Sequence, residues 1–416
     1  MPTGRRGRTS ELRSEAGNMN DYTVRILRSD EHRTAGELFG GSLHRTPAEI
    51  DQWNRAEGVV QPGRVFGAFD DELIGTVRSI DTSLVVPGGR TVTNAAVTGV
   101  GVRSDHTRRG VLRELMHAQL ADCAARGVVT ANLHASEGGI YERFGYGPAT
   151  YGCHYRVDRY RNRLRDDLPE SGAVTRISMA EARARFPEIY ASLPGDRPGL
   201  LGRSRFTWAA LWHWLSRADA RIVTVVHHGT SGVDGFAAYE VRRQDNSTEL
   251  TVHDMHFGTA EAFVGLWRYL CGVDLVDEIV LPNRPLDEPA SLLFADPRGC
   301  RDTGGGDETW LRIVDVPAAL RAATRGNTRP VVLAVHDDLL SGNTGNFRVT
   351  PDGVVNTEQP AQLRMDVATL GMVYLGAWRP STLAALGRVT HTGPEALEQA
   401  DRVFTGDRHA WCGTHF

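Results

Sequence analysis

A strand, a polar turn and the start of a helix follow one another in VTGVGVRSDHTRRGVLR, residues 97–113. Up to Val102 the residues alternate as in a half-buried strand, and from Val111 apolar residues recur at helical spacing. A helix that begins directly after a turn offers free backbone N–H groups and a positive dipole end. The stretch therefore predicts a seat for a phosphate or diphosphate.

The turn itself allows two interpretations. Arg108 and Arg109 would add charge-assisted contacts to a bound anion, and Gly110 would let the backbone approach it closely. A short Arg-Arg-Gly turn is also compatible with an ordinary solvated connection, because it is shorter than the well-known phosphate loops.

The surrounding patterns place this turn in a larger unit. Alternating segments at 64–69, 72–84 and 90–102 predict an antiparallel meander before it. After the helix, residues 128–135 predict a strand and residues 140–144 a short helix. Two further helices are expected upstream, around 31–38 and 48–56, after a short strand at 22–26.

The remainder of the chain divides into two more units. Helices, a meander and another helix recur between residues 166 and 303, which we interpret as a diverged internal repeat without an Arg-Arg-Gly turn. After Gly304-Gly305-Gly306 the pattern changes again. We therefore predict a disordered leader at 1–20, or a start site near Met19, and domains at 21–165, 166–303 and 304–416.

Composition excludes several classes of protein. The 416 residues include 47 basic side chains, all Arg, and 51 acidic ones, so the net charge of −4 argues against general nucleic-acid binding. No run of 18 apolar residues indicates a membrane span. Five scattered Cys without a CxxC spacing favour reduced thiols in the cytoplasm and give no support to a metal site.

The segment that points to a known family is LHASEGGIYERFGYGPAT, residues 133–150. It closely resembles the segment that marks the enhanced intracellular survival (Eis) acetyltransferases of the GNAT superfamily. Similar matches occur at 106–113, 310–320 and 374–384. The resemblance implies a mixed α/β fold of two tandem GNAT domains, the first active and the second degenerate, followed by a sterol-carrier-like α+β domain. It also implies acetyl-CoA as co-substrate, no metal and a homohexamer.

The resemblance assigns two catalytic roles. Acetyl transfer needs a base to deprotonate the amine and an acid for the leaving thiolate. In the family, the tyrosine of Gly-Gly-Ile-Tyr is the acid and the carboxylate of a C-terminal phenylalanine is the base. These positions are Tyr141 and Phe416 here.

The family pattern also implies contacts to the co-substrate. The superfamily's pyrophosphate loop, (Arg/Gln)-x-x-Gly-x-(Gly/Ala), fits 107–112 with Thr107 in place of its first residue and Leu112 in place of its last. The residues expected to hold acetyl-CoA are Val100, Gly101, Val102, Arg108, Arg109, Gly110, Val111, Leu112, Arg113, Ser136 and Glu137.

The acceptor side departs from members that take polycationic aminoglycosides. Phe39, Trp53 and His415 are expected to line the acceptor pocket, but the penultimate residue is His415 rather than an acid. A less acidic pocket weakens binding of multiply charged amines. The resemblance nevertheless implies acetyl transfer to primary amines of small polyamines such as aminoglycosides, at one or several positions. Two alternatives are a protein lysine acetyltransferase and a non-catalytic protein that binds acetyl-CoA or a lipid.

Overall fold

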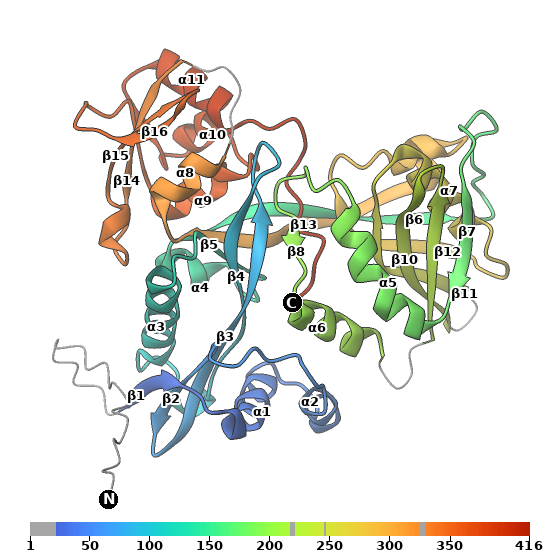
Figure 1. The fold of residues 1–416 in the computed structure, drawn as a ribbon, viewed down its shortest axis with the longest axis horizontal. Helices are drawn as coiled ribbons and strands as arrows, with labels where there is room; N and C mark the ends of the chain where they lie inside the picture. The colour runs from blue at the N-terminus through green and yellow to red at the C-terminus, as the bar shows by residue number, and fades with distance from the viewer. Residues whose placement is uncertain (1–21, 217–220, 245–246, 324–328) are drawn as a thin grey trace, which may run out of the picture.

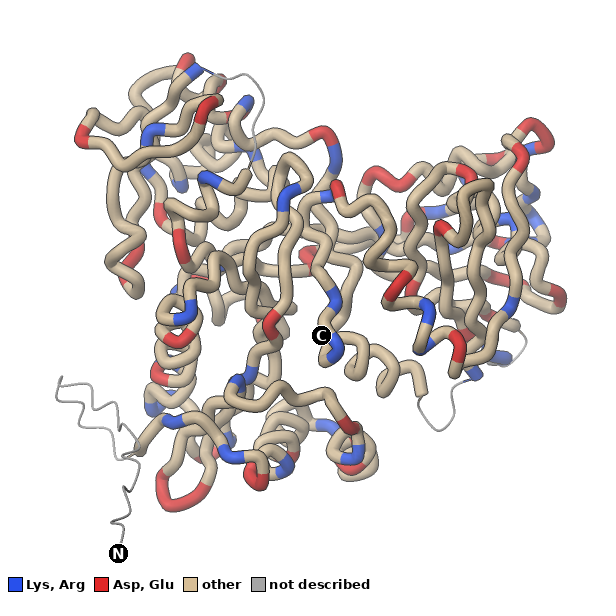
Figure 2. Tube along the Cα trace, viewed as in Figure 1, with Lys and Arg blue, Asp and Glu red and all other residues tan. Residues whose placement is uncertain are grey.

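The computed structural model describes residues 22–216, 221–244, 247–323 and 329–416, so the predicted leader at 1–20 lies outside the described residues. Figure 1 shows three units, with the chain end in the middle of the molecule. Figure 2 shows basic and acidic residues interspersed over all three units in this view.

The first unit is a twisted meander with helices on it, as the sequence predicts. Its elements are β1 (Thr23–Ile26), α1 (His32–Ser42), α2 (Pro47–Asn54), β2 (Val65–Asp70), β3 (Glu72–Val85), β4 (Thr91–Val102), α3 (Val111–Ala125), β5 (Thr130–Leu133), α4 (Gly138–Tyr141) and β6 (Tyr146–Asp158). Sequence analysis did not predict β6. This strand is thirteen residues long and buries most of its side chains.

The second unit repeats this order. Its elements are β7 (Ala173–Ile177), α5 (Met179–Ser192), β8 (Leu201–Gly202), α6 (Arg205–Leu215), β9 (Ile222–Gly229), β10 (Gly232–Gln244), β11 (Ser247–Phe257), α7 (Ala260–Cys271) and β12 (Glu278–Pro285). The predicted helices and meander are all present. β8 leaves this unit and pairs with β3 of the first.

One strand, β13 (Cys300–Ile313), joins the two units into a continuous sheet. It pairs with β5 on one side and with β6 on the other, and β6 pairs in turn with β12. The described part of the chain thus forms a 13-stranded sheet in the order β1-β2-β3-β4-β5-β13-β6-β12-β11-β10-β9-β7, with β8 beside β3.

The predicted boundary at 303/304 falls inside β13, and the third unit begins after Ile313. The boundary rested on Gly304-Gly305-Gly306, which we interpreted as a break. In the structure, this part of the strand pairs with β6, with a register shift between Asp302 and Gly305. A Cβ on Gly305 would overlap the backbone oxygen of Gly152, so the glycine permits a close approach of two strands.

The third unit has its own small sheet, in the order β16-β15-β14-β17-β18. Its elements are α8 (Val316–Ala322), β14 (Val331–His336), β15 (Gly345–Thr350), β16 (Gly353–Asn356), β17 (Leu363–Asp366), α9 (Val367–Tyr374), α10 (Pro380–Ala385), β18 (Thr390–His391) and α11 (Pro394–Phe404).

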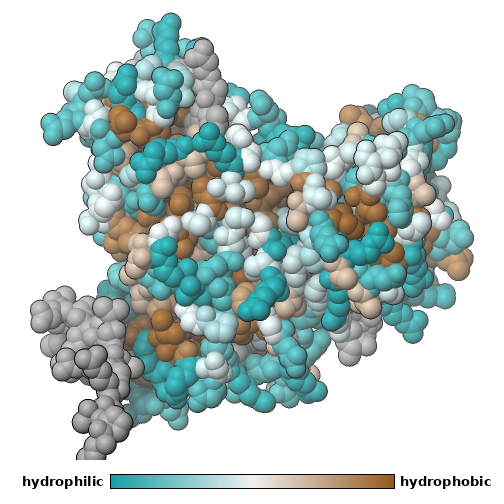
Figure 3. All heavy atoms as spheres, viewed as in Figure 1, coloured by the Kyte–Doolittle hydropathy of each residue, from teal (hydrophilic) through white to brown (hydrophobic). Residues whose placement is uncertain are grey.

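Helix α9 attaches the third unit to the large sheet. All eight of its residues are buried, and a Cβ on Gly147 of β6 would overlap the backbone oxygen of Ala368. Apolar side chains also show at the surface along this junction (Figure 3). Because the third unit is packed this closely, it fixes where the chain leaves α11. The last twelve residues, 405–416, then run as an extended tail to the centre of the molecule (Figure 1).

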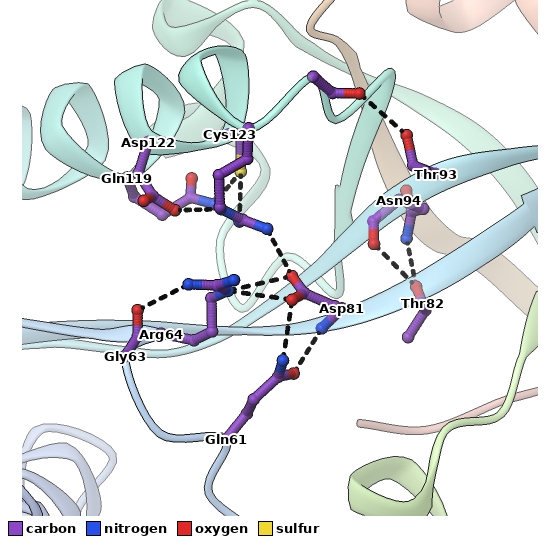
Figure 4. A network of polar contacts seen from close by, with 12 residues as sticks. Gln61, Gly63, Arg64, Asp81, Thr82, Thr93, Asn94, Gln119, Asp122 and Cys123 are labelled. Carbon is purple, nitrogen blue, oxygen red and sulfur yellow. Dashed lines mark hydrogen bonds and ion pairs between the residues drawn. The ribbon is translucent and has the colours of Figure 1, made fainter.

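A polar network fixes α3 and the loop before β2 to the meander (Figure 4). Asp81 of β3 accepts hydrogen bonds from Arg64 at 3.0 Å, from Arg126 at 2.8 Å and from Gln61 at 2.8 Å. Burial disfavours the ionised carboxyl, but the two Arg groups outweigh it and lower the pKa of Asp81. The charged network therefore holds the end of α3 at a fixed place on the sheet.

Candidate active site

A cavity of about 790 Å³ lies where the first unit, the second unit and the C-terminal tail meet. Its wall combines the end of β4 and α4 with α1 and α2, α6, β11, β12 and the tail. The predicted site residues that line it are Phe39, Trp53, Val100, Ser136, Tyr141, His415 and Phe416. The fold thus brings together residues from almost the full length of the chain.

Tyr141 ends the short helix α4 and is buried, with 5% of its surface exposed. Its ring packs edge-to-face on Tyr146 at 6.2 Å. Burial raises the pKa of the phenol, while a hydrogen bond with Ser136 opposes the rise. A phenol that keeps its proton at neutral pH can donate it inside the cavity.

The tail brings Phe416 to the cavity beside His134, the residue after β5. The two rings are 4.6 Å apart between centroids. The imidazole nitrogens of His134 lie 2.8 Å from the backbone oxygen of Glu308 and 3.1 Å from that of Thr414. Because a neutral imidazole carries one N–H, it donates to one of these oxygens at a time. Burial lowers the pKa of His134, although both contacts favour the charged form.

The side chain of Glu308 in β13 binds the backbone of the tail. Its two carboxylate oxygens accept the N–H groups of Cys412 and Gly413, each at 2.7 Å. Asn283 of β12 donates to the same carboxylate at 2.6 Å. Burial raises the pKa of Glu308, and the three donors counteract that rise. The tail is therefore docked on the large sheet by specific hydrogen bonds.

A second clamp on the tail comes from a buried ion pair of the second unit. Arg203 binds both oxygens of Asp254, at 2.7 and 2.9 Å, and both side chains are almost fully buried. The same guanidinium donates to the backbone oxygen of Gly413 at 2.9 Å and to the hydroxyl of Thr414 at 3.0 Å. It also donates to Nε2 of His256 at 2.9 Å, which accepts when that ring is neutral. The second unit thus helps to position the chain end.

The predicted diphosphate turn has the geometry of an anion site. Gly110 is the N-cap of α3 with φ 85°, and no side chain caps the helix. Arg108 also has a left-handed backbone, φ 63°, and its side chain is exposed. The first amides of α3 are thus not capped by a side chain of the described chain.

In the second unit, the start of the equivalent helix, α7, is capped by the protein's own side chains. Thr259 caps α7 by accepting from the N–H of Ala262 at 3.0 Å. Its hydroxyl donates to Asp234 at 2.6 Å, and that carboxylate also contacts His227 at 2.6 Å. A side-chain hydroxyl and a carboxylate thus occupy the helix start that the first unit leaves open. This difference fits a diphosphate at α3 and none at α7.

The end of β4 supplies an open strand edge beside this turn. β4 pairs with β5 from Asn94 to Val97 and then continues without it to Val102. Val100 lines the cavity, whereas Gly101 and Val102 pair with β3 and are not part of its wall. The open edge and the uncapped helix together fit the arm and diphosphate of a CoA thioester.

Other predicted residues lie outside the cavity wall. Arg109 is 3.7 Å from Asp70, and Arg113 is 3.1 Å from Glu114, both on the exposed surface near the turn. Val111, the first residue of α3, is buried, and Leu112 is half-buried. Glu137 is exposed as the N-cap of α4.

Sequence analysis missed part of the site. Four polar residues of the cavity region were not singled out: Arg78, Arg203, Asp254 and Glu308. The second unit's contribution could not be seen from its local pattern. One signal was available, because Arg78 is the one charged residue in LIGTVRSI, residues 73–80 of β3.

Family comparisons agree with this architecture. Models described as acetyltransferase (GNAT) domains match residues 23–149 and 199–313, and one described as a sterol carrier protein domain matches residues 316–413. The N-acetyltransferase Eis of Mycobacterium tuberculosis is 37% identical over 354 residues, 81% of this chain and 84% of that protein. This chain belongs to the Eis family of N-acetyltransferases.

Two further comparisons support the assignment to the Eis family. An uncharacterized N-acetyltransferase of Streptomyces griseus is 33% identical to this chain, and the alignment covers 88% of this chain and 97% of that protein. The crystal structure of Eis1 from Mycobacterium abscessus superposes with a TM-score of 0.86 at 35% identity, covering 95% and 100% of the two chains. The predicted order of two GNAT units and a sterol-carrier-like unit is confirmed, and the chain is an acyltransferase.

Two negative findings concern the described residues alone. No helix among them is long and apolar enough to cross a membrane. Within the same ranges, no group of three His, Cys, Asp or Glu side chains is arranged to hold a metal ion.

Proposed function

We propose that this chain transfers the acetyl group of acetyl-CoA to a primary amine of a small molecule. The observation that carries the proposal is that Tyr141 and Phe416, far apart in sequence, line one cavity next to the open end of β4. Bound acetyl-CoA supplies a thioester, whose carbonyl carbon bonds to the amine nitrogen while the C–S bond breaks.

The residues of the chain then account for the protons. The α-carboxylate of Phe416 takes the proton that the amine loses, and Tyr141 gives its phenolic proton to the leaving sulfur. An α-carboxyl group is ionised at neutral pH because its ordinary pKa is about 3.5. Burial of Tyr141 keeps its proton in place until the thiolate forms. Arg108, Arg109 and the amides at Gly110 hold the diphosphate.

The test is thiol release from acetyl-CoA with a panel of small amines, in a chain that ends at Phe416 and in one that continues a few residues beyond it. A chain extended by the same residues at its N-terminus is the matched control. Loss of turnover in the C-terminal extension alone, with acetyl-CoA binding kept, is expected.

The other outcomes contradict specific parts of the proposal. Equal turnover in all three chains would assign the base to another group. Acetylation of protein lysines but of no small amine would replace the acceptor class. Tight acetyl-CoA binding without turnover on either acceptor would favour a non-catalytic protein.

We also propose, from the family alone, that the chain assembles as a homohexamer and acts in the cytoplasm. Light scattering on the purified chain is expected to give six times the mass of one chain, and a monomer at working concentration would contradict it. Fractionation of the source cells tests the compartment.

A further inference from the structure

Arg78 of β3 places a buried positive charge in the wall of the cavity. Its side chain is 8% exposed and lies in the cavity wall with Trp53, Thr98 and Tyr141. The guanidinium carbon is 4.9 Å from the centre of the Trp53 ring, a distance typical of cation–π contact. Arg78 therefore lines the same cavity as Tyr141, the proposed acid, on the side formed by the meander.

The guanidinium has no counter-ion in the described chain. Its buried Nε has no hydrogen-bond partner, and no carboxylate of residues 22–216, 221–244, 247–323 or 329–416 pairs with it. Other deeply buried Arg residues are paired, for example Arg203 with Asp254 and Arg312 with Asp337. Burying a charge without a partner is costly, so this arrangement points to a ligand that completes it.

The backbone makes room for this side chain. Gly99 on the neighbouring strand has φ 63°, and a Cβ there would lie 2.8 Å from Cγ of Arg78. A glycine at this position thus leaves the space in which the Arg side chain lies. Burial, with the charge of Arg45 nearby, lowers the pKa of Arg78 to about 10, so the group is still cationic at neutral pH.

The side-chain carboxylates of the cavity wall are already engaged, and the α-carboxylate of Phe416 is reserved for the proposed base. Asp254 is paired with Arg203, and Glu49 at the exposed rim accepts from the backbone and hydroxyl of Thr46 in a capping box. His415 keeps an exposed surface, but desolvation by the protein packed around its ring, followed by the charges of His134 and Arg45, lowers its pKa to about 4, so the ring is neutral at pH 7. Arg45 and Arg78 on the wall outnumber the one α-carboxylate of Phe416, so the cavity presents more positive than negative charge to an acceptor.

We propose that the acceptor is a primary amine that also carries an anionic group, and that Arg78 binds that group. A guanidinium suits a carboxylate, phosphate or sulfonate because its planar N–H groups bind two oxygens at once. The proposal rests on the proposed acetyl transfer and narrows its substrate class from amines in general to zwitterionic ones.

Matched substrates test the proposal. L-lysine is cadaverine with one added carboxylate, and O-phosphoethanolamine is ethanolamine with one added phosphate. We expect kcat/KM to favour the anionic partner of at least one pair by roughly 10- to 100-fold, the range typical of a hydrogen-bonded charge. Whichever pair shows the preference identifies the anionic group. No preference in either pair would overturn the proposal.

Variants of the chain separate binding from structure. Arg78→Met is expected to abolish the preference by raising KM for the anionic amine, while KM for cadaverine does not rise and KM for acetyl-CoA is unchanged. Arg78→Lys should restore part of it. Arg90→Met, at an exposed turn, is the matched control. A raised KM for acetyl-CoA in Arg78→Met, or a lower melting temperature, would show instead that Arg78 serves the co-substrate or the fold.

Failure of the two proposals can be told apart. If no amine is acetylated, the proposed transfer fails for these acceptors. Calorimetric titration of L-lysine and of cadaverine into the acetyl-CoA-bound protein then still decides the role of Arg78. Tighter binding of L-lysine that disappears in Arg78→Met would sustain it, and equal binding of both amines would overturn it.

Discussion

The buried carboxylate of Glu308 accepts the backbone N–H of Gly413 at 2.7 Å, close to the point where the chain ends at Phe416. A strand in the middle of the large sheet thus fixes the position of the proposed base. An extended tail loses much conformational entropy when it docks, so it needs contacts of this kind to stay in place. The site is therefore shaped as much by β13 and the second unit as by the first unit.

Replacing Glu308→Gln should loosen the tail. The amide keeps one acceptor oxygen and puts an N–H₂ group against a backbone N–H of Cys412 or Gly413, which costs about 1–3 kcal/mol. We expect kcat to fall roughly 10- to 100-fold through misplacement of Phe416, with KM for acetyl-CoA unchanged. Limited proteolysis should cut the tail faster. The exposed Glu395→Gln is the control, and an unaltered kcat with a protected tail would show that Glu308 does not position it.

Replacing Arg203→Met should destabilise the protein. Asp254 would stay buried without its counter-ion, at a cost of about 3–5 kcal/mol. At present burial opposes ionisation of Asp254, but Arg203 outweighs it and lowers the pKa of the carboxyl. The double variant Arg203→Met/Asp254→Asn should recover part of the loss in urea unfolding. No recovery would mean that the contacts of Arg203 to the tail, rather than the ion pair, carry the stability.

Replacing Tyr141→Phe tests the proposed acid directly. The ring is kept and only the hydroxyl is lost, so packing on Tyr146 should be retained. We expect kcat to fall by about 10²–10⁴, the usual contribution of a positioned acid. Calorimetry should show unchanged acetyl-CoA affinity. Tyr160→Phe, at an exposed position, is the control. A variant that keeps full turnover would remove Tyr141 from the mechanism.

Local sequence patterns predicted most helices and strands, because the periodicity of each element is visible in consecutive residues. The period-two run of β3 and β4 and the helical period of α3 are examples. The position of β13 was not predictable in this way. Its partners β5 and β6 lie far away in sequence, and its glycines resembled a linker until the close approach to Gly152 was visible.

The residues of the site likewise fall into those that the sequence predicted and those that it did not. Tyr141 and Phe416 came from the family resemblance, and the structure brings them to one cavity. Their roles remain predictions. Arg78 and Glu308 were not found, because a charged residue in a strand is informative only when its surroundings are known to be buried. Burial and partners depend on pairing between distant segments, which a single sequence does not display.

Replacing Gly110→Ala should weaken binding of acetyl-CoA. Gly110 has φ 85°, where an Ala costs about 1 kcal/mol or more, and a Cβ would lie 3.3 Å from the hydroxyl of Tyr22. The altered turn would move the amides of α3 away from the diphosphate, so KM for acetyl-CoA should rise several-fold with kcat nearly unchanged. Gly127→Ala, also at positive φ but after α3, controls for strain alone. Equal effects of both substitutions would argue against a diphosphate at Gly110.

Stability should decline in mild acid because of His256. Burial, followed by the charge of Arg203, lowers the pKa of this imidazole to about 4, against about 6.5 in the unfolded chain. Above pH 6.5 neither state is protonated and the group has no effect. As the pH falls from 6.5 towards 4, the unfolded state binds a proton that the folded state does not, so the free energy of unfolding drops by up to about 3 kcal/mol.

The measurement is urea unfolding at pH 7 and pH 5 for the native chain and for His256→Gln, whose amide oxygen can still accept from Arg203. The variant should lose less stability between the two pH values. Part of the decline should remain, since His415 also has a pKa lowered to about 4 and titrates over the same range. His391→Gln, at an exposed position of β18, should behave like the native chain. If His256→Gln does so too, protonation of His256 does not limit the stability of the tail clamp.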